Sequence, residues 1–369
     1  MSEFDTLVGL VSQYSPSGQE RGAVEWLVAR MKLLGYTEAF IDEAGNAVGV
    51  MGKGPKQVVL LGHIDTVPGE INVQTVGATP SGDSPLQNQS SLLYGRGSVD
   101  AKGPLACFAD AVAKVGVKDG WQFVVIGAVE EERESEGARF AANQYKPDFA
   151  IIGEPNLWDR IALGYKGSAW ATVTVKRGQA HTASGEETAA EAAVEVWLKI
   201  KAYVDSFNAD KRKIFDQLLL TLRGVDSDSN DFEQWARLKV GVRLPVEVSP
   251  EAWYEKLNEI TSDSHLHEGD CHLLVEPMGF AIPAWGCEKN TPLVRAFLSG
   301  IRSQGGEPRF VYKTGTADLN IVAPAWKCPA VVYGPGDSAL DHTPNEHINL
   351  EEYTKAVTVL TEALSKLSV

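Results

Sequence analysis

Apolar residues in the first part of the chain follow two different spacings. Continuous apolar runs, which are typical of strands buried on both faces, occupy 57–62, 121–129 and 149–153. Stretches with apolar residues at helical spacing lie beside them, at 19–34, 103–115 and 136–145. Buried strands that alternate with helices predict a largely parallel sheet with helices on its faces.

The middle of the chain has a different pattern. Residues 168–178 alternate strictly between apolar and polar, as a strand with one exposed face does. We expect a long helix, a polar loop, a strand, a helix and a final strand to follow, at about 187–207, 224–234, 236–246, 250–261 and 271–277. This order predicts an inserted α+β, ferredoxin-like domain.

After this insertion the first pattern returns. We expect a helix, two strands and a last helix near 291–303, 308–313, 329–333 and 350–366. The predicted fold is therefore α/β. A catalytic domain with a largely parallel sheet covers 1–164 and 278–369, and an inserted domain covers 165–277.

Composition narrows the classes of function. A chain of 369 residues is long enough for two domains, and its net charge of −15 argues against binding to a nucleic-acid backbone. No run approaches 18 apolar residues, and the start shows no leader peptide, so we expect no membrane association. The four cysteines form no C-x-x-C pair. These features predict a cytoplasmic protein.

Candidate metal ligands follow the apolar runs. His63-x-Asp65 comes directly after 57–62, and a spacing of two on an extended chain points both side chains the same way. Asp65 could bind metal or orient the imidazole of His63. The alternative is a surface turn, because Thr66-Val67-Pro68-Gly69 is one.

Three further positions fit the same pattern. Glu154 follows the run at 149–153, His342 follows the expected strand near 329–333, and Asp100 precedes the helix at 103–115. Asp100 in isolation is equally typical of a helix N-cap, but its carboxylate could also bridge two ions. Imidazole and carboxylate ligands together suit Zn²⁺, Co²⁺ or Mn²⁺ rather than Ca²⁺.

Three adjacent glutamates, Glu130, Glu131 and Glu132, end the run at 121–129. A solvated run of charge is one interpretation, since acidic residues continue beyond the triplet. Acids at the carboxyl end of a buried strand, however, stand where open α/β sheets place their sites. One glutamate could bind metal while its neighbour acts as a general base.

Together, the motifs GHIDTVPG, GRGSVDAKG, EEE…GAR, GEPN and DHTPNEHI resemble those of the M20 family of metallopeptidases and deacylases. The resemblance covers nearly the whole chain. It implies two divalent ions, Zn²⁺ or Co²⁺, in each subunit. His63, Asp100 and Glu154 would bind one ion, while Asp100, one glutamate of the triplet and His342 would bind the other. Asp65 would orient His63.

The family usually has Asp-Glu-Glu where this chain has three glutamates. Counting back from Gly137-Ala138, the resemblance makes Glu132 the ligand and Glu131 the base. If the loop has lost a residue, the two roles move to Glu130 and Glu131.

The resemblance also assigns roles outside the metal ligands. His181 would reach the active site of the partner subunit in a homodimer and stabilise the oxyanion. Arg243, with Asn230 thirteen residues before it, would bind the substrate's α-carboxylate; a strand-edge salt bridge is the alternative for Arg243. The backbone of Gly315 and Thr316 would bind carboxylate, and Asp318 would meet a substrate ammonium.

Within the family, YGRGSVDAKGPLA and IALGYKGSAW are most similar to the lysine-biosynthetic branch. Those enzymes release lysine or ornithine from the terminal glutamate of an acidic amino-group carrier protein. Five cations of the insertion could form a basic approach surface for such a carrier, or simply a solvated face: Lys166, Lys176, Arg177, Lys201 and Lys211. The alternatives are an N-acetylornithine deacetylase or dipeptidase, and a catalytically dead relative that only binds.

Overall fold

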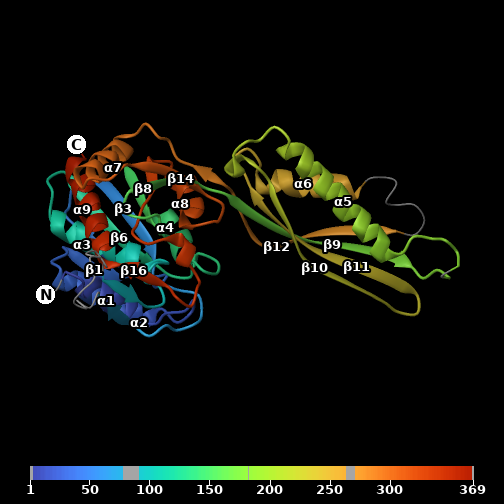
Figure 1. The fold of residues 1–369 in the computed structure, drawn as a ribbon, viewed down its shortest axis with the longest axis horizontal. Coiled ribbons are helices and arrows are strands. Elements are labelled where there is room, and N and C mark those ends of the chain that lie inside the picture. Colours follow the sequence, from blue (N-terminus) through green and yellow to red (C-terminus); the bar gives the residue numbers. More distant parts are fainter. Residues whose placement is uncertain (1–2, 78–90, 182, 263–270, 368–369) are drawn as a thin grey trace, which may run out of the picture. The chain divides into compact units, whose positions relative to one another are not determined.

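The computed structural model describes residues 3–77, 91–181, 183–262 and 271–367 (Figure 1). The chain forms two compact units. The first contains Met1–Gly164, Cys287–Tyr312 and Ala317–Val369, and the second contains Tyr165–Gly286 and Lys313–Thr316. The return to the first unit therefore lies nine residues later than the expected position at 277/278, because the last long strand of the second unit continues to Ile282.

A twisted, mainly parallel sheet forms the centre of the first unit. Its strands run in the order β1-β2-β6-β3-β7-β15-β8-β13, where β13 is Trp285–Gly286, and β14 also pairs with β8. The central strand β3 is parallel to both β6 and β7, and β15 is parallel to β7. The bounds are β1 (Glu38–Ile41), β2 (Ala47–Met51), β3 (Lys56–His63), β6 (Trp121–Ala128), β7 (Phe149–Gly153), β8 (Arg160–Tyr165), β14 (Arg309–Lys313) and β15 (Ala330–Val332).

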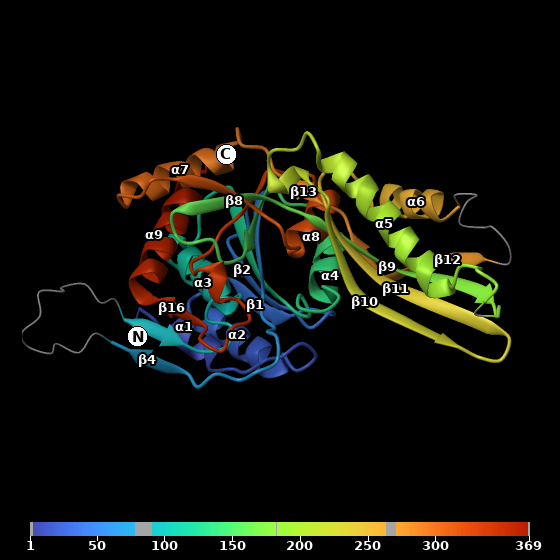
Figure 2. The same cartoon turned by 45° about the vertical axis from the view of Figure 1, so that its right-hand side comes forward.

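Helices cover both faces of this sheet (Figure 2). On one face α3 packs against α1 and α9, and α7 packs against α9; on the other, α4 packs against α8. The bounds are α1 (Asp5–Val11), α2 (Arg21–Leu33), α3 (Lys102–Val115), α4 (Glu136–Gln144), α7 (Pro292–Ser303), α8 (Asp318–Trp326) and α9 (Leu350–Lys366). The predicted α/β fold with a largely parallel sheet is confirmed.

The apolar runs at 57–62, 121–129 and 149–153 became β3, β6 and β7 because both of their faces are covered. Leu60, Phe123 and Ile151 point into the core beneath α3, and all three are fully buried. A small separate sheet joins β4 (Gln74–Val76), β5 (Leu92–Tyr94) and β16 (His347–Asn349) in the order β16-β5-β4.

The second unit is an antiparallel sheet in the order β10-β11-β9-β12, with α5 and α6 on one face. Alternate residues of β11 show which face is covered, since Ala236, Leu238 and Val240 are buried while Arg237 and Lys239 are exposed. The bounds are β9 (Gly167–Gly178), α5 (Ala189–Asn208), β10 (Leu219–Ser229), β11 (Glu233–Leu244), α6 (Pro250–Thr261), β12 (His272–Ile282) and β13 (Trp285–Gly286).

The expected polar loop near 224–234 is wrong in part, because β10 continues to Ser229 and only a short turn follows. β10 is an edge strand with a register shift between Leu222 and Gly224, and its last residues are polar and exposed.

Within the described ranges, no helix combines the length and the apolar character needed to cross a membrane.

Candidate metal centre

Three adjacent strands deliver side chains to one edge of the first unit's sheet. β3 ends on His63, β6 ends two residues before Glu130, and β7 ends immediately before Glu154. In the register, His63 pairs with Ala128 and Gly62 pairs with Gly153. His63 therefore lies between the glutamate triplet on one side and Glu154 on the other.

Asp100 lies between two imidazoles. Its Oδ1 is 3.1 Å from Nε2 of His63, and its Oδ2 is 3.1 Å from Nε2 of His342. His342 comes from the loop before β16, and its Nε2 also lies 3.0 Å from Oε1 of Glu132. A ligand shared between two ions must offer one oxygen to each of them. The carboxylate of Asp100 is arranged in this way, because its two oxygens face two different imidazoles.

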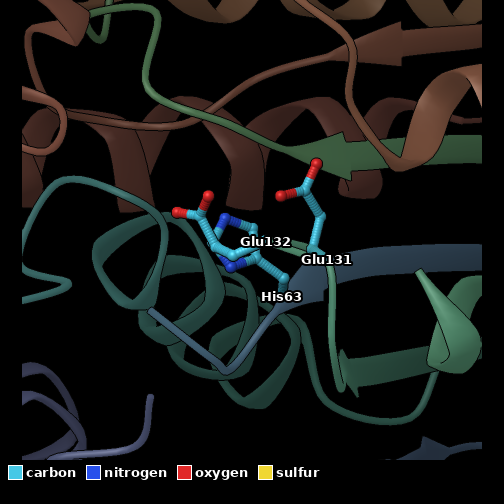
Figure 3. A group of neighbouring side chains, drawn as sticks. All are labelled: His63, Glu131 and Glu132. Atoms are coloured by element: carbon cyan, nitrogen blue, oxygen red, sulfur yellow. The ribbon is translucent and has the colours of Figure 1, made fainter. Parts of the chain in front are cut away.

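Three groups of side chains have ligand atoms that all lie within 4.8 Å of one another. His63, Asp100 and Glu154 form one group, and Asp100, Glu132 and His342 form another. The third contains His63, Glu131 and Glu132, which lie side by side in Figure 3. The first two share Asp100, and their nitrogen and carboxylate oxygen donors fit zinc or a similar divalent ion.

Asp65 is a fully buried carboxylate that holds the glutamate loop. Its Oδ1 accepts the backbone N–H of Glu131 at 3.0 Å, and its Oδ2 accepts that of Glu132 at 3.1 Å. The hydroxyl of Ser17 also donates to Oδ2, and Nδ1 of His63 lies 3.4 Å from Oδ1. Asp65 therefore fixes both the imidazole and the loop that carries the triplet.

The site concentrates acidic groups in a buried place. Burial raises the pKa of Glu131 and of Glu154 well above the usual range, and the charge of His63 offsets this in part. Hydrogen bonds to Asp100 and Glu132 raise the pKa of His342 to about 10. Without bound cations, this cluster therefore retains protons at neutral pH.

Metal binding should release protons and tighten as the pH rises. In the metal-free protein, the contacts of protonated His342 stabilise the fold fully below pH ~6.5 and are lost as the pH rises through about 10. An ion must displace that proton, so we expect apparent affinity to rise about tenfold per pH unit for each proton released, between about pH 7 and 10. Calorimetric titration in buffers of different ionisation enthalpy measures the proton count. An affinity independent of pH would contradict the expectation.

Asp318, the first residue of α8, lies in the first unit, and its side chain is buried. Among the described residues, neither of its carboxylate oxygens has a hydrogen-bond partner at normal geometry. Burial raises its pKa to about 7, although His63 and Ser135 lower it in part. Because a buried carboxylate without a partner is costly, this oxygen pair suits a cationic ligand.

Arg243 and Thr316 lie together in the second unit. Nη1 of the half-buried Arg243 is 3.4 Å from the hydroxyl of Thr316, and Gly315 precedes that threonine. No carboxylate in the described part of the chain makes a salt bridge to Arg243, so the strand-edge alternative is not observed. Burial, followed by the nearby charge of Arg223, lowers the pKa of Arg243.

Two other expected residues occupy exposed turns of the second unit. Asn230 turns the chain between β10 and β11, and its side-chain oxygen accepts the backbone N–H of Phe232 and of Glu233, both at 2.9 Å. Nδ1 of His181 lies 3.1 Å from the backbone nitrogen of Ala183. If Nδ1 accepts that hydrogen bond, Nε2 carries the proton and can donate.

The proposed basic surface needs a correction. Lys166 is fully buried, and its ammonium donates to the backbone carbonyls of Phe215 and Gln217, so it cannot face a partner. Three others form ion pairs of 2.6–2.7 Å: Arg177 with Glu187, Lys201 with Asp205, and Lys211 with Glu247. Of the five, Lys176 alone is exposed without such a pair among the described residues.

Comparisons with known proteins cover almost the whole chain. Residues 59–366 match the model of peptidase family M20/M25/M40. The chain is 40% identical to a [LysW]-lysine hydrolase of Deinococcus radiodurans, over 97% of this chain and 94% of that protein. It is 37% identical to a putative [LysW]-lysine/[LysW]-ornithine hydrolase of Thermococcus kodakarensis, over 97% and 90%. Its fold matches a dinuclear metal binding peptidase of Bacillus subtilis with a TM-score of 0.69, at 12% identity over 98% and 96% of the two chains.

Proposed function

Because this chain belongs to the M20/M25/M40 family of metallohydrolases, we propose that it releases lysine, or ornithine, from an acidic amino-group carrier protein. The bond cut is the amide between the amino acid's α-amine and the γ-carboxyl of the carrier's terminal glutamate. This would be the last step of carrier-protein lysine biosynthesis. The names of the Deinococcus and Thermococcus relatives, which specify LysW-linked amino acids, support this substrate.

The main support for a two-metal hydrolase is the position of the Asp100 carboxylate, whose two oxygens face His63 and His342. Two ions, Zn²⁺ or Co²⁺, would be held by His63, Asp100 and Glu154 and by Asp100, Glu132 and His342. When bound, such ions lower the pKa of water and polarise a carbonyl.

Glu131 is the general base of this proposal. It lies within the same cluster as His63 and Glu132, and the hydrogen bond from its backbone to Asp65 fixes its position. Its carboxylate takes the proton of the attacking water and returns it to the leaving amine. The nearby cationic centre would keep this carboxylate ionised despite its burial.

Asp318 would recognise the side-chain ammonium of lysine or ornithine. The ammonium would supply a counter-charge to the two buried oxygens of Asp318, which have no hydrogen-bond partner among the described residues, and would thereby offset the cost of burying them. The guanidinium of Arg243 and the backbone of Gly315 and Thr316 would bind the α-carboxylate. Asn230 lies in the turn at the opposite end of β11 from Arg243, so it cannot share this role with Arg243 within one subunit.

We further propose a homodimer in which His181 of one subunit serves the active site of its partner. The exposed position of His181 and the proton on its Nε2 would suit a donor to the developing oxyanion. Exposed apolar side chains on α5 of the second unit, Val194 and Leu198, are available to such an interface.

The uncovered face of the second unit's sheet suits an acidic carrier. It carries the exposed Lys176, Arg223, Arg237 and Lys239 together with the half-buried Arg243, and it also carries Asp226, Asp228, Glu233 and Glu276. This face replaces the basic surface expected from sequence. A cytoplasmic location is part of the proposal, and all four cysteines are free.

Rates on carrier-linked lysine and ornithine should exceed those on free N-acetyl-lysine and N-acetyl-ornithine by about 10²-fold or more in kcat/KM, since only the carrier offers the sheet face an acidic surface. The assay uses enzyme loaded with Zn²⁺ or Co²⁺. Equal rates on the acetyl compounds would replace the proposal with a general N-acyl-amino-acid deacylase. A protein that holds far less than two ions per chain and acts on neither substrate would be a binding module.

A further inference from the structure

A buried ion pair lies behind the metal centre, in residues to which the motifs gave no role. Glu346 stands four residues after His342 and is fully buried, and Arg96 is 7% exposed. Nη1 of Arg96 lies 2.9 Å from Oε2 of Glu346. Removing two charges from water costs free energy, so we expect this buried ion pair to have a structural role in the contacts that it makes.

The carboxylate of Glu346 holds the backbone at Asp100. Its Oε1 accepts the N–H of Val99 at 2.9 Å and the N–H of Asp100 at 3.0 Å. Because this charged carboxylate accepts hydrogen bonds from two successive backbone N–H groups, it fixes the direction of the backbone at Val99 and Asp100. Since Asp100 faces both imidazoles, its orientation affects both groups of ligands.

The guanidinium of Arg96 holds two other loops of the site. Its Nε donates to the carbonyl of Gly69 at 2.8 Å, in the turn that follows His63 and Asp65. Its Nη1 also donates to the carbonyl of Thr343 at 3.2 Å, directly after His342. One ion pair therefore joins the segments that carry His63, Asp100 and His342.

The backbone of His342 is in a conformation that needs support. Its φ of 61° lies in the left-handed region, which a residue other than glycine adopts only when its surroundings enforce it. The bond from Arg96 to the next carbonyl supplies part of that support. Asp65 offers a parallel, since its buried carboxylate holds two successive N–H groups of the glutamate loop in the same way.

We infer that Arg96 and Glu346 are a positioning pair that sets the approach of His342 to Asp100 and thereby the affinity for the ion bound by Asp100, Glu132 and His342. The inference rests on the metal centre proposed above, and not on the identity of the substrate. Neither side chain touches an ion or the substrate in this role. The pair acts through the backbone on either side of the ligands.

The substitution Glu346→Gln tests the inference. A glutamine must turn its NH₂ group either toward the donor of Arg96 or toward the two backbone donors, so one set of contacts is lost. We expect the ion held by Asp100, Glu132 and His342 to bind about 10- to 100-fold more weakly, as with other residues behind metal ligands, and the other ion, whose group shares Asp100 but not His342, to lose clearly less affinity. Calorimetry with Zn²⁺ gives both affinities, and the visible spectrum of Co²⁺-loaded protein reports the altered ligand geometry.

A matched control is Glu187→Gln, which breaks the ion pair with Arg177 in the second unit and should leave both affinities and the Co²⁺ spectrum unchanged. If Glu346→Gln does not fold, Arg96→Lys keeps the charge but loses the forked contacts, and it should show the same selective loss. Equal weakening of both ions, or unchanged binding of both, would overturn the inference. A wild-type protein that binds two ions but does not release carrier-linked lysine would refute the proposed function alone.

Discussion

The substitution Glu131→Gln should reduce kcat by about 10³-fold or more while the protein keeps two ions per chain. General acid–base catalysis alone typically contributes about 10²–10⁴-fold, and here one carboxylate would serve in both proton transfers. Glutamine has nearly the same shape and keeps the backbone N–H that binds Asp65, but it can accept no proton. Single-turnover kinetics together with elemental analysis of the metal content provide the measurement.

The neighbouring acid gives the matched control. Glu130 lies at the start of the loop, 3.4 Å from the guanidinium of the exposed Arg133, and Glu130→Gln should leave kcat within about twofold, because surface ion pairs contribute little. Loss of one ion in Glu131→Gln, with loss of turnover in Glu130→Gln, would instead move the base and ligand roles one residue back. The two variants together therefore decide between the two registers of the triplet.

The substitution Asp100→Asn should remove metal from both sites and lower kcat/KM by about 10³-fold or more. Metal ions contribute several kcal/mol of charge stabilisation, and each ~1.4 kcal/mol corresponds to a factor of ten in rate. An amide carries no charge and offers one oxygen in place of two, so it cannot face both imidazoles as an acceptor. Equilibrium dialysis against Zn²⁺ and the rate on carrier-linked lysine measure the two effects.

Asp110→Asn is the matched control for this change, since Asp110 is a buried aspartate on the helix that follows Asp100, and its carboxylate accepts hydrogen bonds from Thr6 and Tyr353 in the core. This variant should change thermal stability without changing metal content. An Asp100→Asn protein that still binds two ions at wild-type affinity would remove Asp100 from its bridging role.

The residues that sequence patterns located best lie at the ends of buried parallel strands. His63 and Glu154 follow strands whose two faces are both covered, so the apolar runs stand out and their ends are sharp. The carboxyl ends of such strands meet at one edge of a sheet, which brings together side chains that are far apart in sequence. Asp100 and His342 follow no long strand, and the family resemblance was needed to assign these two candidates to particular ions.

Other features depend on contacts that no local pattern contains. Glu346 lies in a polar stretch and gives no sequence signal of burial, since its partners are the distant Arg96 and the backbone near Asp100. In the sequence Lys166 has the features of an exposed lysine, but in the structure its ammonium donates hydrogen bonds to three backbone carbonyls inside the second unit. The short helix α1 and the hairpin β1–β2 were missed because neither has a long periodic run.

The order of strands in the first unit has a consequence for the way the protein is made. β15 lies between β7 and β8, yet it follows the whole second unit in the sequence. A ribosome therefore releases the second unit, which has its own core, before the sheet of the first unit can close. His342 emerges later still, so the nascent chain cannot complete its ligand set until β15 and the loop after it have been made. A divalent ion bound by Asp100, Glu132 and His342 would therefore report that both parts of the first unit have come together.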